Sequence, residues 1–205
     1  MPILVHTVRK FVASPQISEI VIALRPEDIE WVRDLLAAES QAKLIRLVEG
    51  GDSRQQSVEN ALAEIGADID LVAVHDAVRP FVDAPIIERV ILEASQTGAA
   101  IVGIVPIDTV KLAHLNKVRQ TLTRERLVLT QTPQVFRTDL LKQAFEKARE
   151  DGFIGTDESS LVERLEQVEV SVVPGSDRNI KITRPNDMDL ARLFLSLEAA
   201  ERIAS

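Results

Sequence analysis

The feature that most constrains the fold is a regular alternation along the chain. Short runs rich in β-branched residues predict strands at 20–24, 44–48, 71–75, 101–105 and 168–173. Longer stretches with helical spacing of apolar residues lie between them, at 27–38, 54–65, 85–95 and 140–150. This order is typical of parallel strands joined by crossover helices, so we expect an α/β protein with an open sheet.

The segment 108–132 departs from this alternation, because no helix follows the strand before it. Two short runs at 110–112 and 118–122 flank Asn116 and predict a hairpin arm that leaves the sheet. A two-stranded hairpin is marginally stable alone in water. We therefore expect the arm to pack against a second copy of the chain, and the alternative is a solvated loop.

The beginning of the chain also departs from the pattern. Residues 2–12 predict a helix whose apolar stripe is Ile3, Leu4, Val8, Phe11 and Val12. An open α/β sheet usually begins with a strand, so we expect the first strand and its following loop to be missing.

Composition narrows the class of protein. The chain has 205 residues, enough for a single domain over 1–205 with the arm at about 108–132. Its net charge of -8 argues against nucleic acid as the main partner. It has no apolar run of the ~20 residues that a membrane span needs. With 0 cysteines and no signal-peptide core, it is expected to be cytoplasmic and to lack disulfides and thiolate metal sites.

The loop 50–57 is the first candidate binding segment. Gly50 and Gly51 let the backbone approach a ligand, and Ser53 with Gln56 has capping-box spacing at a helix start. Amides at such a start can meet an anion or a base edge. A plain turn with a helix cap explains the same residues equally well.

The second candidate segment is 75–80, directly after an apolar strand. Ligands of open α/β sheets bind at the carboxyl ends of strands. Asp76 and Arg79 can present an acceptor and a fixed cation to a sugar phosphate there. The alternative is an internal ion pair that braces the loop, and His75 is interpreted as a packed, structural histidine.

Several cations follow other predicted strand ends on this acidic chain. They are Lys111, Arg124, Arg126 and Lys181. The segment 156–158 places a capping hydroxyl and two acids at a helix start, which we interpret as mainly structural. The sequence contains no Walker loop, nucleophile elbow or dinucleotide fingerprint. Taken alone, these residues predict a site for a phosphorylated metabolite and no particular reaction.

Six motifs together carry a more specific resemblance. In order they are Gly50-Gly51-Asp52 with Ser57, His75-Asp76-Ala77-Val78-Arg79-Pro80, Asp108-Thr109, Gln131-Thr132-Pro133-Gln134, Thr156-Asp157-Glu158 and Asn179-Ile180-Lys181-Ile182-Thr183. From about Pro2 to Ala191 the chain resembles the 2-C-methyl-D-erythritol 4-phosphate cytidylyltransferases of the non-mevalonate route to isoprenoids. The resemblance implies a Rossmann-like, mostly parallel sheet of the nucleotide-diphospho-sugar transferase type.

The resemblance also implies a reaction. The 4-phosphate of methylerythritol attacks the α-phosphorus of CTP, Mg²⁺ is held mainly by the CTP phosphates, and pyrophosphate leaves. The attacking group is already an anion, so catalysis depends on alignment and charge neutralisation. Gly51, Asp52 and Ser57 correspond to residues that read the cytosine, and no residue is assigned as a metal ligand.

The acceptor site implied by the resemblance draws on both subunits of a homodimer. Four residues hold the methylerythritol phosphate: Asp76, Arg79, Thr109 and Thr132. Arg124 and Lys181 match the residues that position this phosphate for attack. Because the arm of such dimers reaches the neighbouring subunit, Thr109 and Arg124 are expected to serve the partner's site.

One departure from the family pattern keeps alternatives open. Members begin with a strand and a loop of the form Ala-Ala-Gly-x-Gly-x-Arg followed by a Lys, which we expect to be missing here. Each lost cation can cost ~2.7 to 4 kcal/mol of transition-state stabilisation. The alternatives are therefore a cytidylyltransferase for ribitol phosphate and a non-catalytic dimer that binds sugar phosphates.

Overall fold

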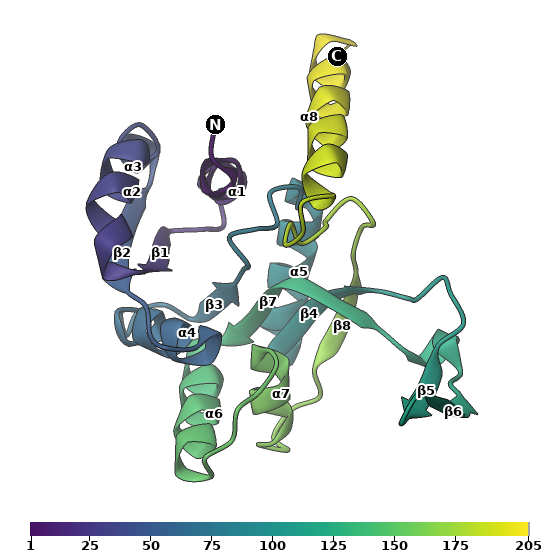
Figure 1. The fold of residues 1–205 in the computed structure, drawn as a ribbon. Helices are drawn as coiled ribbons and strands as arrows, with labels where there is room; N and C mark the ends of the chain where they lie inside the picture. The colour runs from purple at the N-terminus through teal and green to yellow at the C-terminus, as the bar shows by residue number, and fades with distance from the viewer. Residues whose placement is uncertain (205) are drawn as a thin grey trace.

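The computed structural model describes residues 1–204, with side chains described as far as residue 200. It shows an α/β protein with helices on both sides of its strands and a small arm at one side (Figure 1). The expected fold class is confirmed. In the described part of the chain, no helix is long and apolar enough to cross a membrane.

The larger sheet has four strands in the order β3-β7-β4-β8. Its strands are β3 (Leu71–Val74), β4 (Ala99–Ile104), β7 (Leu129–Arg137) and β8 (Ser171–Pro174). β4 and β8 are parallel, whereas β7 runs antiparallel to both of its neighbours. The amino-terminal half of β7 consequently lies at the carboxyl ends of β3 and β4.

A separate sheet contains two parallel strands, β1 (Glu19–Leu24) and β2 (Leu44–Glu49). Helix α1 (Ile3–Val12) packs on it through Val5 and Val8, and α4 (Arg54–Ala63) contacts its other side. The predicted helix at the start of the chain is therefore confirmed. From β1 to β2 the chain forms η1 (Pro26–Asp28), α2 (Ile29–Leu35) and α3 (Glu39–Ala42) in turn.

The four-stranded sheet is covered on both faces. Helix α5 (Ala84–Thr97) packs on one face together with Phe11. The other face carries α6 (Thr138–Glu150), α7 (Glu158–Glu163) and Leu62 of α4. Helix α8 (Asp187–Ala204) extends away from the sheets near α1 and packs through its first turns on Phe81 and Ile182 (Figure 1).

The arm is the predicted hairpin. β5 (Lys111–His114) and β6 (Lys117–Thr121) pair antiparallel, and η2 (Arg124–Arg126) follows them. Leu115 and Asn116 both have positive φ, of 49° and 59°, as a two-residue type I′ turn requires. Every residue of both strands is exposed, and the pair projects from the sheet (Figure 1).

Two predicted elements need correction, and one strand has no counterpart among the predictions. The helix predicted over 27–38 is divided into η1 and α2, which ends at Leu35. The strand predicted over 168–173 begins only at Ser171, because its pairing with β4 starts there, opposite Ala100. Val168 and Val170 precede this pairing, although both pack against the core. β7 was not predicted, because its buried polar residues interrupt the apolar pattern that indicates a strand.

Candidate functional site

A polar cavity of about 260 Å³ lies where β3 ends and β7 begins. Its lining comes from the ends of these strands, from the starts of α4 and α7, and from the segment after β8. The lining residues are Arg54, Asp76, Arg79, Thr130, Gln131, Thr132, Gln134, Thr156, Asp157 and Lys181. The cavity therefore sits at the carboxyl ends of strands, where the sequence predicted a ligand site.

Asp76 is the centre of charge in this cavity. Its carboxylate lies 3.2 Å from each of three cationic nitrogens, Nε of Arg54, Nε of Arg79 and Nζ of Lys181. Burial alone would raise the pKa of Asp76, but the three cations lower it below its ordinary value. Arg54 is also paired with the Glu158 carboxylate, and Asp157 lines the cavity too. Arg79 and Lys181 are therefore the cations that can accept a phosphate here.

Asp76 and Arg79 form the internal ion pair that the sequence offered as an alternative to a ligand site. Both residues also line the cavity, so the ion pair and a ligand site are compatible. The Arg79 side chain is 12% exposed and donates from Nη1 to the Asn179 carbonyl at 2.8 Å. Lys181 is 42% exposed and can turn toward a ligand. The structure brings together four predicted acceptor residues: Asp76, Arg79, Thr132 and Lys181.

The loop that carries Lys181 is held by a buried amide. Asn179 is fully buried, and its Nδ2 donates to the Gln131 side chain at 3.1 Å and to the Thr132 carbonyl at 2.9 Å. Gln131 in turn donates to the Ser176 carbonyl at 2.9 Å. These bonds fasten the segment after β8 to β7 and so place Lys181 at the cavity.

His75 braces the turn that presents Asp76. Its Nε2 lies 3.0 Å from the Arg79 carbonyl, which can only accept, so this nitrogen carries the proton. The Thr132 hydroxyl lies 3.0 Å from Nδ1 and also accepts from the Asp76 amide. The ring of Phe11 packs against the imidazole at 4.7 Å between centroids. These contacts are those of a structural histidine.

The burial of His75 predicts that the stability of the protein depends on pH. Burial lowers the pKa of His75 from 6.5 to about 4. The unfolded chain therefore binds a proton as the pH falls below 6.5, and the folded chain does so only near pH 4. Through this group, the free energy of unfolding should fall by up to about 3 kcal/mol across that window as the pH is lowered. Urea unfolding of the parent and of His75→Gln at several pH values checks this: equal slopes for the two proteins would contradict it.

The loop after β2 has the predicted capping geometry. The Ser53 hydroxyl accepts from the Gln56 amide at 3.1 Å, and the Gly51 amide donates to the Ser57 hydroxyl at 3.0 Å. The Asp52 amide donates to the Gln56 side chain at 2.9 Å. A Cβ at Gly51 would lie 2.3 Å from Gln56 Cγ, so this position needs glycine. The amides expected to meet a ligand are bonded within the loop, through side chains that can turn away.

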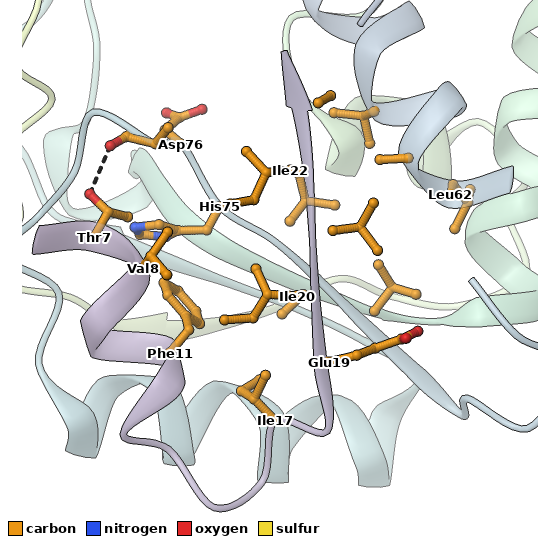
Figure 2. Close-up of a pocket in the computed structure, with 18 of the residues that line it drawn as sticks. Thr7, Val8, Phe11, Ile17, Glu19, Ile20, Ile22, Leu62, His75 and Asp76 are labelled. Atoms are coloured by element: carbon orange, nitrogen blue, oxygen red, sulfur yellow. Dashed lines mark hydrogen bonds between the residues drawn. The ribbon is translucent and has the colours of Figure 1, made fainter. Parts of the chain in front are cut away.

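A second, apolar cavity of about 450 Å³ separates the β1-β2 sheet from the four-stranded sheet. It lies between β1 and β3, which pair with β2 and β7 but not with each other. Figure 2 shows Val8 and Phe11 of α1 on one side of β1 and Leu62 of α4 on the other. Arg54, Asp76 and Lys181 line both cavities, so the apolar cavity opens toward the polar one. Ser57 lines only the apolar cavity.

Four predicted site residues line neither cavity: Gly51 and Asp52 of the loop after β2, and Thr109 and Arg124. Thr109 and Arg124 belong to the exposed arm, where Arg124 donates to the Ile107 carbonyl and lies 3.4 Å from Glu125. They are not brought to this chain's own cavity. Their expected role in a partner's site stays a prediction.

Sequence reasoning did not assign six polar side chains of the cavity to the site: Arg54, Thr130, Gln131, Gln134, Thr156 and Asp157. The 156–158 segment was interpreted as structural, and its N-cap is Asp157, whose Oδ1 accepts from the Ser160 amide at 3.1 Å. Gln134 is fixed by donating to Asp157 Oδ2 at 2.8 Å. For Gln131, Gln134, Thr156 and Asp157 the signal available was a place within the six motifs, and for Arg54 it was a position at a helix start.

The carboxylates of the cavity do not form a metal site. In the described residues, no group of three or more His, Cys, Asp or Glu is placed to hold an ion. Asp76 is engaged by cations, and Asp157 accepts hydrogen bonds from neighbouring groups. This donor set does not fit a magnesium ion held by the protein itself.

The fold and the cavity define an α/β protein with a candidate anion site at the carboxyl ends of its strands. The family 2-C-methyl-D-erythritol 4-phosphate cytidylyltransferase (IspD) matches residues 1–197. The protein of that name from Solibacter usitatus is 63% identical over 209 residues, covering 100% of this chain and 85% of the relative. The one from Acidobacterium capsulatum is 46% identical, covering 95% of this chain and 83% of the relative.

Solved structures agree with these relatives. The 4-diphosphocytidyl-2C-methyl-D-erythritol synthase of Anaerococcus prevotii superposes with a TM-score of 0.90 at 30% identity, covering 96% of this chain and 86% of that one. The Thermus thermophilus 2-C-methyl-D-erythritol 4-phosphate cytidylyltransferase gives 0.77 at 33% identity, covering 94% and 87%. The chain belongs to the 2-C-methyl-D-erythritol 4-phosphate cytidylyltransferase family, and it is therefore an enzyme of the nucleotidyltransferase class.

Proposed function

We propose that this chain transfers the cytidylyl group of CTP to 2-C-methyl-D-erythritol 4-phosphate and releases pyrophosphate, in isoprenoid precursor synthesis. The single observation that carries the proposal is the cluster of Arg79, Lys181 and Asp76 at the mouth of a polar cavity in a chain of this family. The cations attract the acceptor's phosphate, and Asp76 and Thr132 can bond its hydroxyls. CTP and this pathway support a cytoplasmic location.

Alignment of two anions is the chemical task in this proposal. The acceptor phosphate oxygen attacks the α-phosphorus, and the bond from that phosphorus to pyrophosphate breaks. No proton has to be removed from the attacking group, so the protein acts by positioning and by neutralising charge. Mg²⁺ enters as part of the nucleotide substrate, and the loop of Gly51, Asp52 and Ser57 reads the cytosine.

The acceptor is tested by pyrophosphate release from CTP with methylerythritol phosphate and, separately, with ribitol 5-phosphate. Relatives named for methylerythritol 4-phosphate favour the first acceptor. A clear preference in kcat/KM for methylerythritol phosphate is expected. A preference for ribitol phosphate would overturn the proposed substrate, and binding without turnover would support a non-catalytic dimer.

We also propose that the apolar cavity between β1 and β3 accepts one further strand. It is lined by apolar side chains of α1 and α4 and by two strand edges, the environment of a central strand. A strand matching the six residues of β1 would join the two sheets. The loop after it would emerge beside Arg54, Asp76 and Lys181, where a glycine-rich segment can meet the triphosphate.

Adding the family's strand and glycine-rich loop before Met1 tests this second proposal. The extended chain should unfold at a higher temperature and release pyrophosphate faster, because both strand edges become paired and two cations are added. The matched control has the same length, with serine and aspartate in place of the strand's apolar residues. Equal gains from the control would contradict strand insertion.

The arm supports a proposal of dimerisation. Leu112, Leu115 and Val118 are 52%, 79% and 64% exposed on a hairpin that has little support of its own. Apolar side chains gathered on such an arm fit burial against a second copy. Thr109 and Arg124 would then reach the partner's cavity.

We expect dimers by sedimentation at micromolar concentration. Arg124→Ala should fold normally, sediment as a dimer and lose activity or acceptor affinity, because the removed cation serves the site and not the fold. Arg119→Ala, also on the arm, is the control. A monomeric parent would remove the argument from the arm.

A further inference from the structure

Arg54 links three parts of the molecule that meet at the polar cavity. It is the first residue of α4, directly after the loop expected to read the nucleotide. Its Nη1 and Nη2 donate to the two carboxylate oxygens of Glu158 at 2.7 and 2.9 Å. Its Nε donates to Asp76 Oδ1 at 3.2 Å. The guanidinium thus spans α4, α7 and the turn after β3.

The two carboxylate oxygens of Asp76 have different partners. Oδ1 is engaged by Arg54, and Oδ2 lies 3.2 Å from both Arg79 Nε and Lys181 Nζ. Those two cations are the groups assigned to the acceptor, so Oδ2 is the oxygen on the acceptor's side. Without Arg54, the carboxylate could rotate and pair more closely with the cations that a phosphate needs.

Glu158 makes Arg54 a rigid support. The Glu158 side chain is 1% exposed, and burial raises the pKa of its carboxyl group while the Arg54 bond opposes that rise. A bidentate pair with a buried carboxylate fixes the plane of the guanidinium. Lysine cannot reproduce this planar fork, because an ammonium offers a point charge.

We propose that Arg54 is a positioning residue, which the buried Glu158 orients and which in turn orients the Asp76 carboxylate for the acceptor sugar phosphate. The inference rests on the proposed function, since it names how the acceptor half of that site is kept in place. It predicts a loss confined to acceptor binding, with CTP binding kept once the protein is folded.

The experiment separates positioning from mere stabilisation. Arg54→Met alone leaves Glu158 buried and unpaired, so it should unfold at a lower temperature. The double variant Arg54→Met/Glu158→Met replaces the ion pair with apolar side chains and should recover most of the melting temperature. Calorimetry then measures the Kd for methylerythritol phosphate and for CTP. In the double variant we expect the first to stay about tenfold or more above the parent value, the effect of one charged hydrogen bond.

The controls cover the other outcomes. Arg149 of α6 lies 3.1 Å from Glu59, which is on α4 like Arg54 but away from the cavity. Arg149→Met breaks this pair and should leave both Kd values unchanged. Acceptor affinity that recovers together with the melting temperature in the double variant would overturn the inference. Arg54→Lys should bind the acceptor as poorly as the double variant, and full affinity there would also overturn it.

A ligand-free measurement keeps the inference testable if the proposed function fails. If the parent does not bind methylerythritol phosphate, that substrate is wrong, whatever Arg54 does. NMR titration of the Asp76 carboxyl carbon in Arg54→Met, well below the melting temperature of this variant, then decides: the pKa of Asp76 should rise, because one of its three cations is gone while Glu158 is kept. An unchanged titration would show that Arg54 does not hold Asp76, and would overturn the inference.

Discussion

Replacing Lys181 with methionine is expected to lower kcat/KM for methylerythritol phosphate by about 10² to 10³-fold, the effect of removing one preorganised charge-stabilising donor. Lys181 is 42% exposed and lies 3.2 Å from Asp76, so it is free to bind a phosphate while remaining fixed near the cavity. Methionine keeps much of the length of the apolar stem and removes the charge. Steady-state pyrophosphate release measures the loss.

Lys147 supplies a matched control for this variant. It is 43% exposed and lies 3.3 Å from Asp151 on the outer side of α6, so its ion pair is equivalent and remote from the cavity. Lys147→Met should retain parental kcat/KM. Equal losses in the two variants, or no loss in Lys181→Met, would show that Lys181 does not act on the acceptor phosphate.

The second large effect is on stability. Phe136 is fully buried in β7, with α6 packed over it, and Phe136→Ala should lower the free energy of unfolding by about 3 to 5 kcal/mol. The loss comes from removed apolar contact and from the cavity that remains. Urea denaturation at neutral pH measures it.

Leu129 on the same strand is the control for Phe136. It is 52% exposed, so Leu129→Ala should change the free energy of unfolding by no more than about 0.5 kcal/mol. A small effect at Phe136 would mean that the four-stranded sheet is not the stable core. A large effect at Leu129 would instead indicate that this end of β7 is covered in solution, for example by a second copy.

The sequence predicted most of the fold where one periodicity dominates. The predicted strands that became β1 to β4 and the helices α1, α4, α5 and α6 were located within a few residues, because each carries an uninterrupted apolar pattern. β7 escaped prediction because Gln131, Thr132 and Gln134 are buried by the hydrogen bonds of the site and not by apolar packing. Strand β7 therefore lacks the apolar pattern that would indicate a strand in the sequence.

The candidate site was predicted in part, for a related reason. Asp76, Arg79 and Lys181 follow strand ends, which the carboxyl-end rule brings together. Arg54 escaped because nothing local shows that its partner is Glu158, more than a hundred positions along the chain. Thr109 and Arg124 could not be placed in a cavity from one chain, because the arm carries them away from the sheet.

The central claim is that cations at the carboxyl ends of the sheet select a phosphorylated acceptor. Calorimetric titration of the chain with methylerythritol 4-phosphate and with unphosphorylated methylerythritol tests it most directly. We expect binding at least about a hundredfold tighter for the phosphate, as two charged hydrogen bonds allow, and weaker binding as salt is raised. Equal affinity for the two compounds would contradict it.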